Sequence, residues 1–210
     1  MGLLGEMTLL RYFQRTDGIR PDVLTVAADS EADRLAAIAE VVADRSAVYI
    51  TRPLPGAPER YSLAAVGPLA QVWPKGGAIL AEPQHELLVP FTESVSLAGY
   101  STELRSSHQA STSVRLSLHW LVSVPVNDDL KVSARLVDAS GAVVSVTDQV
   151  PVHNTYPTWA WTPGETVADS YDLSLPPDSG AEPYRLLVIL YRAADGSEVG
   201  RAELGQVSTS

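Results

Sequence analysis

The segment Val-Arg-Leu-Ser-Leu-His-Trp, residues 114–120, alternates apolar and polar side chains without a break. Successive side chains of a β-strand point to opposite faces, so this period of two predicts a strand with one buried face. Trp120 lies in the apolar phase, and we expect it in a core. His119 lies in the other phase, and we expect it to face solvent or the edge of a sheet.

The same period of two continues on both sides of this strand and indicates an antiparallel unit. Turn signals such as Ala139-Ser140-Gly141 and Asp195-Gly196 separate the strands. Seven or eight short strands with turns at regular intervals predict a sandwich of immunoglobulin-like type over residues 84–210. Besides 114–120, the segments with this pattern are 95–99, 132–137, 143–146, 184–191 and 198–204.

The apolar period changes to 3.6 towards the amino terminus, which predicts a small α/β domain over residues 1–80 and an α+β class overall. Ser30 is the expected N-cap of a helix. Short apolar runs flank that helix, so residues 22–52 are expected to form a βαβ unit with parallel strands. The expected elements are helices over 5–16 and 31–45 and strands over 23–27, 47–51, 61–66 and 69–73.

Composition excludes several kinds of partner and site. The net charge of −10 and the absence of a basic stripe argue against a nucleic-acid partner. The chain has no cysteine, which removes disulfides and thiolate metal sites. No run of 18 apolar residues occurs, so the chain as written is expected to be soluble. Met1-Gly2 before Leu3-Leu4-Gly5 is typical of a start placed inside a longer sequence.

Side chains that could do chemistry do not converge in the sequence. The four histidines are scattered without a metal-ligand spacing, and no nucleophile elbow or phosphate-binding glycine motif is present. We therefore expect no catalytic residue, no metal and no cofactor. Several aspartates flank turn residues, where turn formation is the simplest interpretation and a calcium site in a loop is the alternative. These are Asp128, Asp129, Asp138, Asp178 and Asp195.

Four polar residues near the predicted βαβ unit are candidates for ligand contact, because ligands of parallel sheets bind beyond the carboxyl ends of the strands. They are Asp29, Ser30, Arg52 and Arg60. Without a phosphate-binding motif, a helix cap with solvated charges is the preferred interpretation.

Residues 153–172 contain the candidate binding surface. Tyr156, Trp159 and Trp161 could form a platform on which a sugar ring stacks, because an indole has a broad apolar face and one donor. If the segment is extended, both indoles point to one side of the backbone. The alternative is that one tryptophan packs in the sandwich core and the other covers an edge. Pro163-Gly164 then reverses the chain.

With these features in view, the chain resembles the soluble carboxy-terminal region of bacterial multi-pass membrane glycosyltransferases of the protein-mannosyltransferase-like, lipid-phosphate-sugar-using superfamily. The similar segments cover nearly the whole chain. They are Leu10–Gln14, Gly18–Val23, Val48–Pro55, Glu59–Tyr61, Val66–Leu69, Leu97–Tyr100, Leu116–Trp120, Arg135–Asp138, Asn154–Thr158 and Trp161–Glu165.

The resemblance implies a parent enzyme whose catalytic carboxylates lie among transmembrane helices, with this region at the extracytoplasmic face of the membrane. No catalytic residue carries over, because that catalytic part is not in this sequence. The resulting hypothesis is a non-catalytic accessory region that contacts glycan or acceptor, with the membrane-embedded remainder of a parent chain as partner. The alternative is a structural or protein-interaction module that meets its partner through an open sheet edge. An independent hydrolase would need an acid pair that the sequence does not display.

Overall fold

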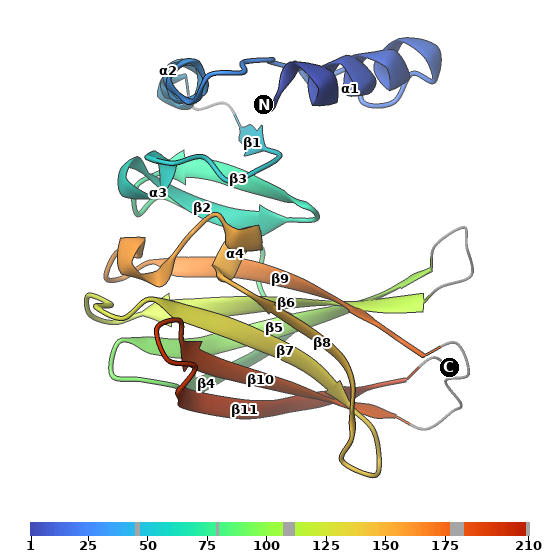
Figure 1. Ribbon diagram of the computed structural model, residues 1–210, viewed down its shortest axis with the longest axis vertical. Helices are drawn as coiled ribbons and strands as arrows, with labels where there is room; N and C mark the ends of the chain where they lie inside the picture. The colour runs from blue at the N-terminus through green and yellow to red at the C-terminus, as the bar shows by residue number, and fades with distance from the viewer. Residues whose placement is uncertain (45–46, 79, 107–111, 177–182, 209–210) are drawn as a thin grey trace.

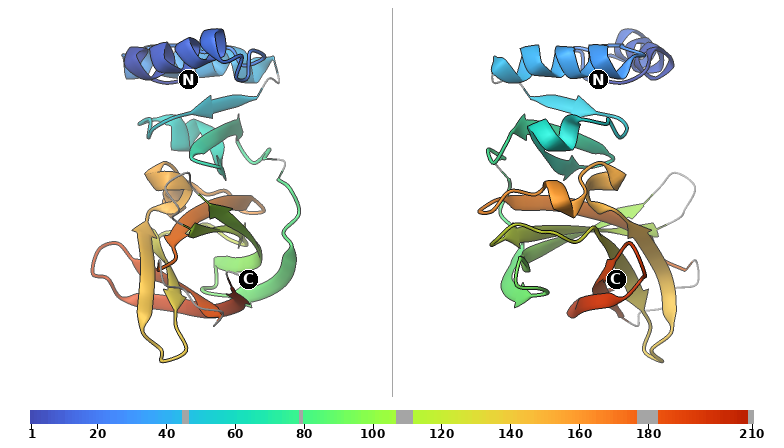
Figure 2. Two further views of the ribbon diagram at one scale, coloured as in Figure 1. Left: turned by 90° about the vertical axis from the view of Figure 1, so that its right-hand side faces the viewer. Right: turned by 60° about the vertical axis from the view of Figure 1, so that its left-hand side comes forward.

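The computed structural model describes residues 1–210 except 45–46, 79, 107–111, 177–182 and 209–210. The molecule is elongated, and its layers follow one another along the long axis (Figure 1). Two helices lie at one end, a small sheet follows, and a β-sandwich forms the larger part. The two rotated views in Figure 2 show the same order of layers.

The sandwich consists of two four-stranded antiparallel sheets in the described part of the chain, in the orders β4-β5-β6-β9 and β11-β10-β7-β8. The alternation that predicted these strands is visible in their burial, since Leu116, Leu118 and Trp120 are all fully buried. The β-sandwich prediction is thereby confirmed. The strands are β4 (His85–Pro90), β5 (Val95–Ser106), β6 (Thr112–Val122), β7 (Leu130–Val137), β8 (Val143–Gln149), β9 (Thr166–Ser174), β10 (Tyr184–Arg192) and β11 (Glu198–Val207).

The order of the strands follows that of immunoglobulin-like sandwiches. With β5 and β6 as strands A and B, β7 and β8 become C and C′, and β9, β10 and β11 become E, F and G. The sheets then read ABE and C′CFG, and β4 is an additional strand beside A. The hairpin turns at Gly141 and Gly196 lie where the sequence predicts them, and both glycines have positive φ.

The amino-terminal layers contain α1 (Leu4–Thr16), α2 (Glu31–Ala43), β1 (Val48–Ile50), α3 (Ala57–Arg60), β2 (Tyr61–Val66) and β3 (Leu69–Pro74). Both predicted long helices are present. The Ser30 side chain accepts a hydrogen bond from the Asp33 amide at 3.1 Å, as expected for an N-cap. The last residues of the expected second helix, 45–46, lie outside the described residues.

The predicted βαβ unit is wrong. The small sheet has the order β1-β3-β2, and both of its pairings are antiparallel. Residues 23–27 form no strand beside β1; their ladder contact is an isolated parallel bridge between Gly2 and Ala27. The prediction took the apolar run for a buried strand. In the structure the run is not buried, and Leu24 is 83% exposed. The β3 strand, which follows a tight turn after β2, takes the place next to β1 instead.

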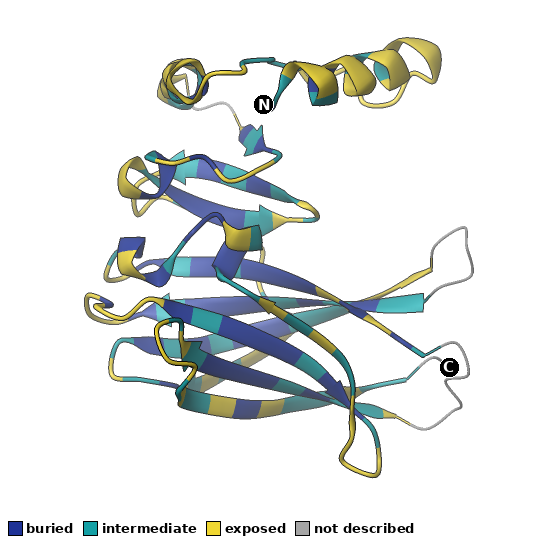
Figure 3. Ribbon diagram, viewed as in Figure 1, coloured by how far each residue is buried: buried dark blue, intermediate teal, exposed yellow. Residues whose placement is uncertain are grey.

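The segment between β8 and β9 joins the layers. It contains α4 (Pro151–Asn154) and a 3₁₀ turn, η1 (Thr158–Ala160), and lies between the small sheet and the sandwich (Figure 1). Burial is continuous from the small sheet through this segment into the sandwich (Figure 3). Buried residues of both layers belong to one hydrophobic cluster, from Ile38 and Leu63 to Trp120 and Leu190.

None of the described helices has both the length and the apolar character needed to cross a bilayer.

Candidate functional site

The three aromatic candidates have different environments. Tyr156 is fully buried and Trp161 is 4% exposed, whereas Trp159 is 47% exposed. The expectation that both indoles lie on one side of an extended strand is wrong, because the 3₁₀ turn Thr158–Ala160 separates them. The Trp161 indole turns inward and its Nε1 donates to the carbonyl of Tyr156 at 3.2 Å. Trp159 alone of the three has a ring face available to a ligand.

Buried hydrogen bonds hold the turn that carries Trp159 in place. The Thr158 hydroxyl donates to the Asp128 carbonyl at 2.7 Å and accepts from the Leu130 amide at 2.9 Å. Thr158 is itself fully buried, so these bonds tie the turn to the start of β7. The Asp128 side chain forms an ion pair at 3.2 Å with Arg192, the last residue of β10. Trp159 is therefore displayed on an anchored turn with charged groups nearby.

A buried polar network lies under this turn. The Tyr156 hydroxyl is 3.0 and 3.1 Å from the two carboxylate oxygens of Glu165, which is 4% exposed. Lys75 Nζ donates to the same hydroxyl at 3.0 Å and to the carbonyls of Pro58 and Ala160 at 2.7 and 2.5 Å. Burial raises the pKa of Tyr156 and lowers the pKa of Lys75. These groups bind one another across the junction between the layers.

A left-handed turn closes the neighbouring edge of the sandwich. Val152, His153 and Asn154 have positive φ values of 56°, 54° and 63°, a conformation that costs non-glycine residues free energy. Asp169 stabilises it, because its Oδ1 accepts from the Val152 amide at 2.8 Å and from the Ser170 amide at 2.8 Å. The Tyr171 hydroxyl donates to Oδ2. Burial raises the pKa of Asp169 to about 7.

His153 and Ser170 lie close together and resemble part of a catalytic dyad. His153 Nε2 is 3.3 Å from the Ser170 hydroxyl and 2.8 Å from the carbonyl oxygen of Gly67. A carbonyl can only accept, so Nε2 carries the proton and cannot receive one from the serine. The pair joins the sandwich to the β2–β3 turn rather than activating a nucleophile.

Several of the other polar candidates have structural contacts. The Asp29 carboxylate accepts from the Leu4 amide at 2.9 Å, and Arg52 pairs with Glu6 at 2.5 Å. Asp138 accepts from the amides of Ser140 and Ala142, both at 2.9 Å. Asp195 likewise accepts from Ser197 at 2.8 Å. Asp178 lies outside the described residues, among which no cluster of three metal-ligating side chains occurs.

His119 faces neither solvent nor a sheet edge, contrary to the expectation, because its strand β6 lies between β5 and β9. It is 8% exposed, and burial lowers its pKa. The expectation assumed a solvated outer face for its sheet, but Pro83 in the segment before β4 packs against Gly99, the register partner of His119 on β5.

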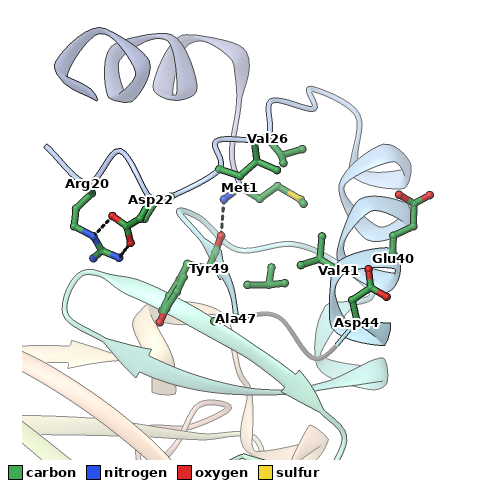
Figure 4. Close-up of a pocket in the computed structure, with 12 residues that line it drawn as sticks. Met1, Arg20, Asp22, Val26, Glu40, Val41, Asp44, Ala47 and Tyr49 are labelled. Atoms are coloured by element: carbon green, nitrogen blue, oxygen red, sulfur yellow. Dashed lines mark hydrogen bonds and ion pairs between the residues drawn. The ribbon is translucent and has the colours of Figure 1, made fainter. Parts of the chain in front are cut away.

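A cavity of about 630 Å³ lies between residues 20–26, α2 and β1 (Figure 4). Its apolar lining includes Val26, Val41 and Val48. The Arg20 guanidinium binds the Asp22 carboxylate at 2.8 and 2.9 Å at its rim. Glu40 and Asp44 of the α2 side also line the cavity, and the Met1 amino group donates to the Tyr49 carbonyl within it.

Comparison with known proteins finds partial structural similarity only. No family model and no curated protein matches the chain. A calcium-binding mutant of β-glucuronidase 2 from Bacteroides uniformis has a TM-score of 0.39 at 14% identity, over 67% of this chain and 15% of that protein. Another B. uniformis β-glucuronidase structure gives 0.40 at 12% identity, with the same coverage. A glycosyl hydrolase family 2 member from Bacteroides cellulosilyticus gives 0.36 at 14%, over 67% and 16%.

The chain thus spans about 15% of the length of these proteins. Similarity at this level carries no inference about what the chain does, and its function has to be argued from its own side chains.

Sequence reasoning missed the polar residues that organise this region. Lys75, Glu165 and Asp169 all contribute to buried networks, yet none was a candidate. Asp169 could have been found, because it stands in the apolar phase of a strand between Val167 and Tyr171. A carboxylate in that phase is either buried with donors around it or ends the strand. Lys75 and Glu165 flank glycine-containing turns and carry no such signal.

Proposed function

We propose that this chain is a non-catalytic accessory module that contacts a glycan, or the acceptor of a glycan, through Trp159. The observation that carries the proposal is a half-exposed indole on a turn that buried hydrogen bonds hold in place. An aromatic face fixed in one orientation loses little conformational freedom when a flat ligand stacks on it. The Asp128–Arg192 pair supplies both an acceptor and donors for hydroxyl groups in the same region.

The buried acids and the lysine described above support a binding role over a catalytic one. Glu165 and Asp169 are nearly or fully buried and bind internal donors, so a substrate cannot reach them without rearrangement of the linking segment. The context of a membrane glycosyltransferase rests on the resemblance of the sequence. In that context the module lies at the extracytoplasmic face and orients glycan or acceptor for the membrane-embedded part of the parent chain.

The test is a titration of the full chain with neutral oligosaccharides, followed by tryptophan emission and by calorimetry. A dissociation constant of up to about 10 mM is expected, because the site is weak and offers a single aromatic side chain for stacking. Trp159→Ala should abolish the emission change and weaken binding at least tenfold, about 1.4 kcal/mol. Trp73→Phe is the matched control, because it also removes one indole but lies in β3. Absence of any heat or emission change, or equal binding by Trp159→Ala, would show that Trp159 is no sugar platform.

A protein-interaction role is the second candidate, and β8 is the observation that favours it. This strand lies at the edge of its sheet, where Val143 and Val146 are about half exposed. An edge strand with exposed apolar side chains is suited to pairing with a strand of a partner. If the oligosaccharide titration is silent and Val146→Lys abolishes capture of the membrane-embedded part of the parent chain, this role replaces the first.

A further inference from the structure

Helix α1 packs against the rest of the molecule with its polar side. Met7 is its one fully buried side chain. Arg11 donates from Nε to the Thr25 hydroxyl at 2.7 Å and from a terminal nitrogen to the Thr25 carbonyl at 2.8 Å. Gln14 Nε2 donates to the carbonyls of Arg20 and Val23 at 2.9 and 2.7 Å. Viewed down the helix axis, with roughly 100° per residue, Met7, Arg11 and Gln14 lie within an arc of about 60°.

The apolar side of α1 faces outward. Leu9, Leu10, Tyr12 and Phe13 are between 40% and 59% exposed and cover an arc of about 160° on the opposite side. This is the reverse of a surface helix in a globular protein, which buries its apolar face and exposes its polar one. Leu24, in the segment that Gln14 and Arg11 hold, is 83% exposed and adds to the apolar surface at this end of the molecule.

The segment that contains α1 carries no net side-chain charge. Residues 1–28 contain three arginines and three carboxylates, so their side-chain charges cancel. The remaining residues therefore carry the whole net charge of −10. In Figure 1, α1 and α2 lie side by side at the end of the long axis, and α2 brings the exposed carboxylates Glu31, Asp33 and Glu40 to this end. A surface that meets the outward side of α1 therefore meets apolar side chains, and the carboxylates of α2 disfavour an anionic surface over an uncharged one.

A second copy of the chain fits this surface less well than a lipid bilayer does. A stable protein interface contains about 20–30 residues on each side, whereas α1 is a 13-residue helix with few outward apolar side chains. Insertion into the interfacial region of a bilayer has no such minimum, because binding strength scales with the apolar area that is buried. Leucines together with Phe and Tyr are the side chains that interfacial helices bury there.

We infer that α1 is an interfacial membrane helix, and that it lies flat on a lipid bilayer with Leu9, Leu10, Tyr12 and Phe13 inserted below the headgroups. Arg11 and Gln14 keep the helix parallel to the end of the molecule, so the body stands away from the bilayer on its long axis. This inference does not depend on the glycan contact at Trp159, which lies on the sandwich side of the molecule.

The experiment is flotation of the full chain with phosphatidylcholine vesicles. The chain is expected to float with the vesicles, and Leu9→Asp with Phe13→Asp should lower the bound fraction at least about tenfold. Leu88→Asp is the control, because Leu88 is 68% exposed but lies on β4; it should leave binding unchanged. Raising salt from about 0.1 to 0.5 M should change binding less than about twofold, because the inserted side chains are uncharged and phosphatidylcholine has no net charge. Circular dichroism checks that both variants fold.

Three results would overturn the inference. The first is no flotation at about 10 mM lipid, well above what insertion of several large side chains requires. The second is equal loss of binding in Leu88→Asp. The third is a dimer in sedimentation equilibrium that the α1 double variant dissociates, without any flotation, which would identify a second copy as the occupant. Oligosaccharide binding measured on the same variants keeps this test separate from that of Trp159.

Discussion

At the scale of single residues, Asp169 is the group whose protonation the fold controls most directly. Burial raises its pKa from 3.8 to about 7, so between these values the folded chain holds a proton that the unfolded chain has lost. The stabilisation from this group is therefore complete below about pH 4 and is lost as the pH rises to about 7. Asp169→Asn keeps the acceptor for the Val152 amide but removes the titration.

We expect the free energy of unfolding of this variant to fall less steeply with pH than that of the wild type. The difference between the two slopes reaches at most about 1.4 kcal/mol per pH unit between pH 4 and 7. Denaturant unfolding at several pH values measures it. Asp172→Asn is the control, because the ion pair with Arg115 lowers the pKa of Asp172 and its contribution changes only at acidic pH. Parallel slopes for Asp169→Asn and wild type would contradict the prediction.

A second prediction at this scale concerns the hydroxyl of Tyr156. Tyr156→Phe preserves the buried ring but removes the donor to Glu165 and an acceptor for Lys75. The carboxylate then remains buried with one partner fewer, and we expect a loss of about 1–3 kcal/mol in unfolding free energy. Tyr12→Phe serves as the comparison, because its ring is exposed and its hydroxyl should contribute nothing measurable. A Tyr156→Phe variant as stable as the wild type would mean that the network carries no net stabilisation.

At the scale of elements, the attachment of α1 depends on Glu6. Its carboxylate accepts from the Leu3 amide at 2.9 Å and the Thr51 hydroxyl at 2.8 Å, and pairs with Arg52. The bond from Arg52 is the main reason that the pKa of Glu6 falls from 4.5 to about 2. A lowered pKa means that this attachment is present above about pH 4.5 and is lost as the pH falls towards 2.

Glu6→Gln should therefore loosen α1 at neutral pH, where the wild type keeps it attached. We expect tryptic cleavage after Arg15 to be several-fold faster in the variant, because cleavage follows the population of the detached helix. Glu93→Gln is a control in a loop of the sandwich. If cleavage after Arg15 proceeds at the wild-type rate in Glu6→Gln, Glu6 does not hold the helix.

Elements also show what the sequence could and could not reveal. The strands of the sandwich were predictable because burial on one face leaves a period of two, as in residues 114–120. Helix α2 was predictable because two signals indicate the same helix: Ser30 as its N-cap and the apolar stripe that follows. The run Val23–Ala27 failed because apolar content alone does not distinguish a buried strand from an exposed loop segment. The 3₁₀ turn that separates Trp159 from Trp161 failed because it depends on Thr158 bonding to Asp128 and Leu130, which are about 30 residues away in the chain.

At the scale of the whole molecule, the layers share a core and polar contacts, although composition predicts a division between residues 80 and 84. Lys75 of the amino-terminal part donates to Tyr156 and Ala160, and the Gly67 carbonyl binds His153. Buried residues of both parts form a single cluster. The division into two domains stays a prediction, and these contacts indicate that the sandwich alone is incomplete.

The last prediction follows from those contacts. A fragment of residues 84–210 loses Lys75 and the Gly67 carbonyl, and it exposes the linking segment with its buried Glu165. Each unpaired buried group costs about 1–3 kcal/mol, and a domain of this size loses roughly 2–4 °C in Tm per kcal/mol. We therefore expect the fragment to melt at least about 4 °C below the full chain, with Lys75→Met in the full chain giving part of that shift. Equal melting temperatures, or two separate transitions in the full chain, would instead show that the layers are stable independently, since shared burial couples unfolding into one step.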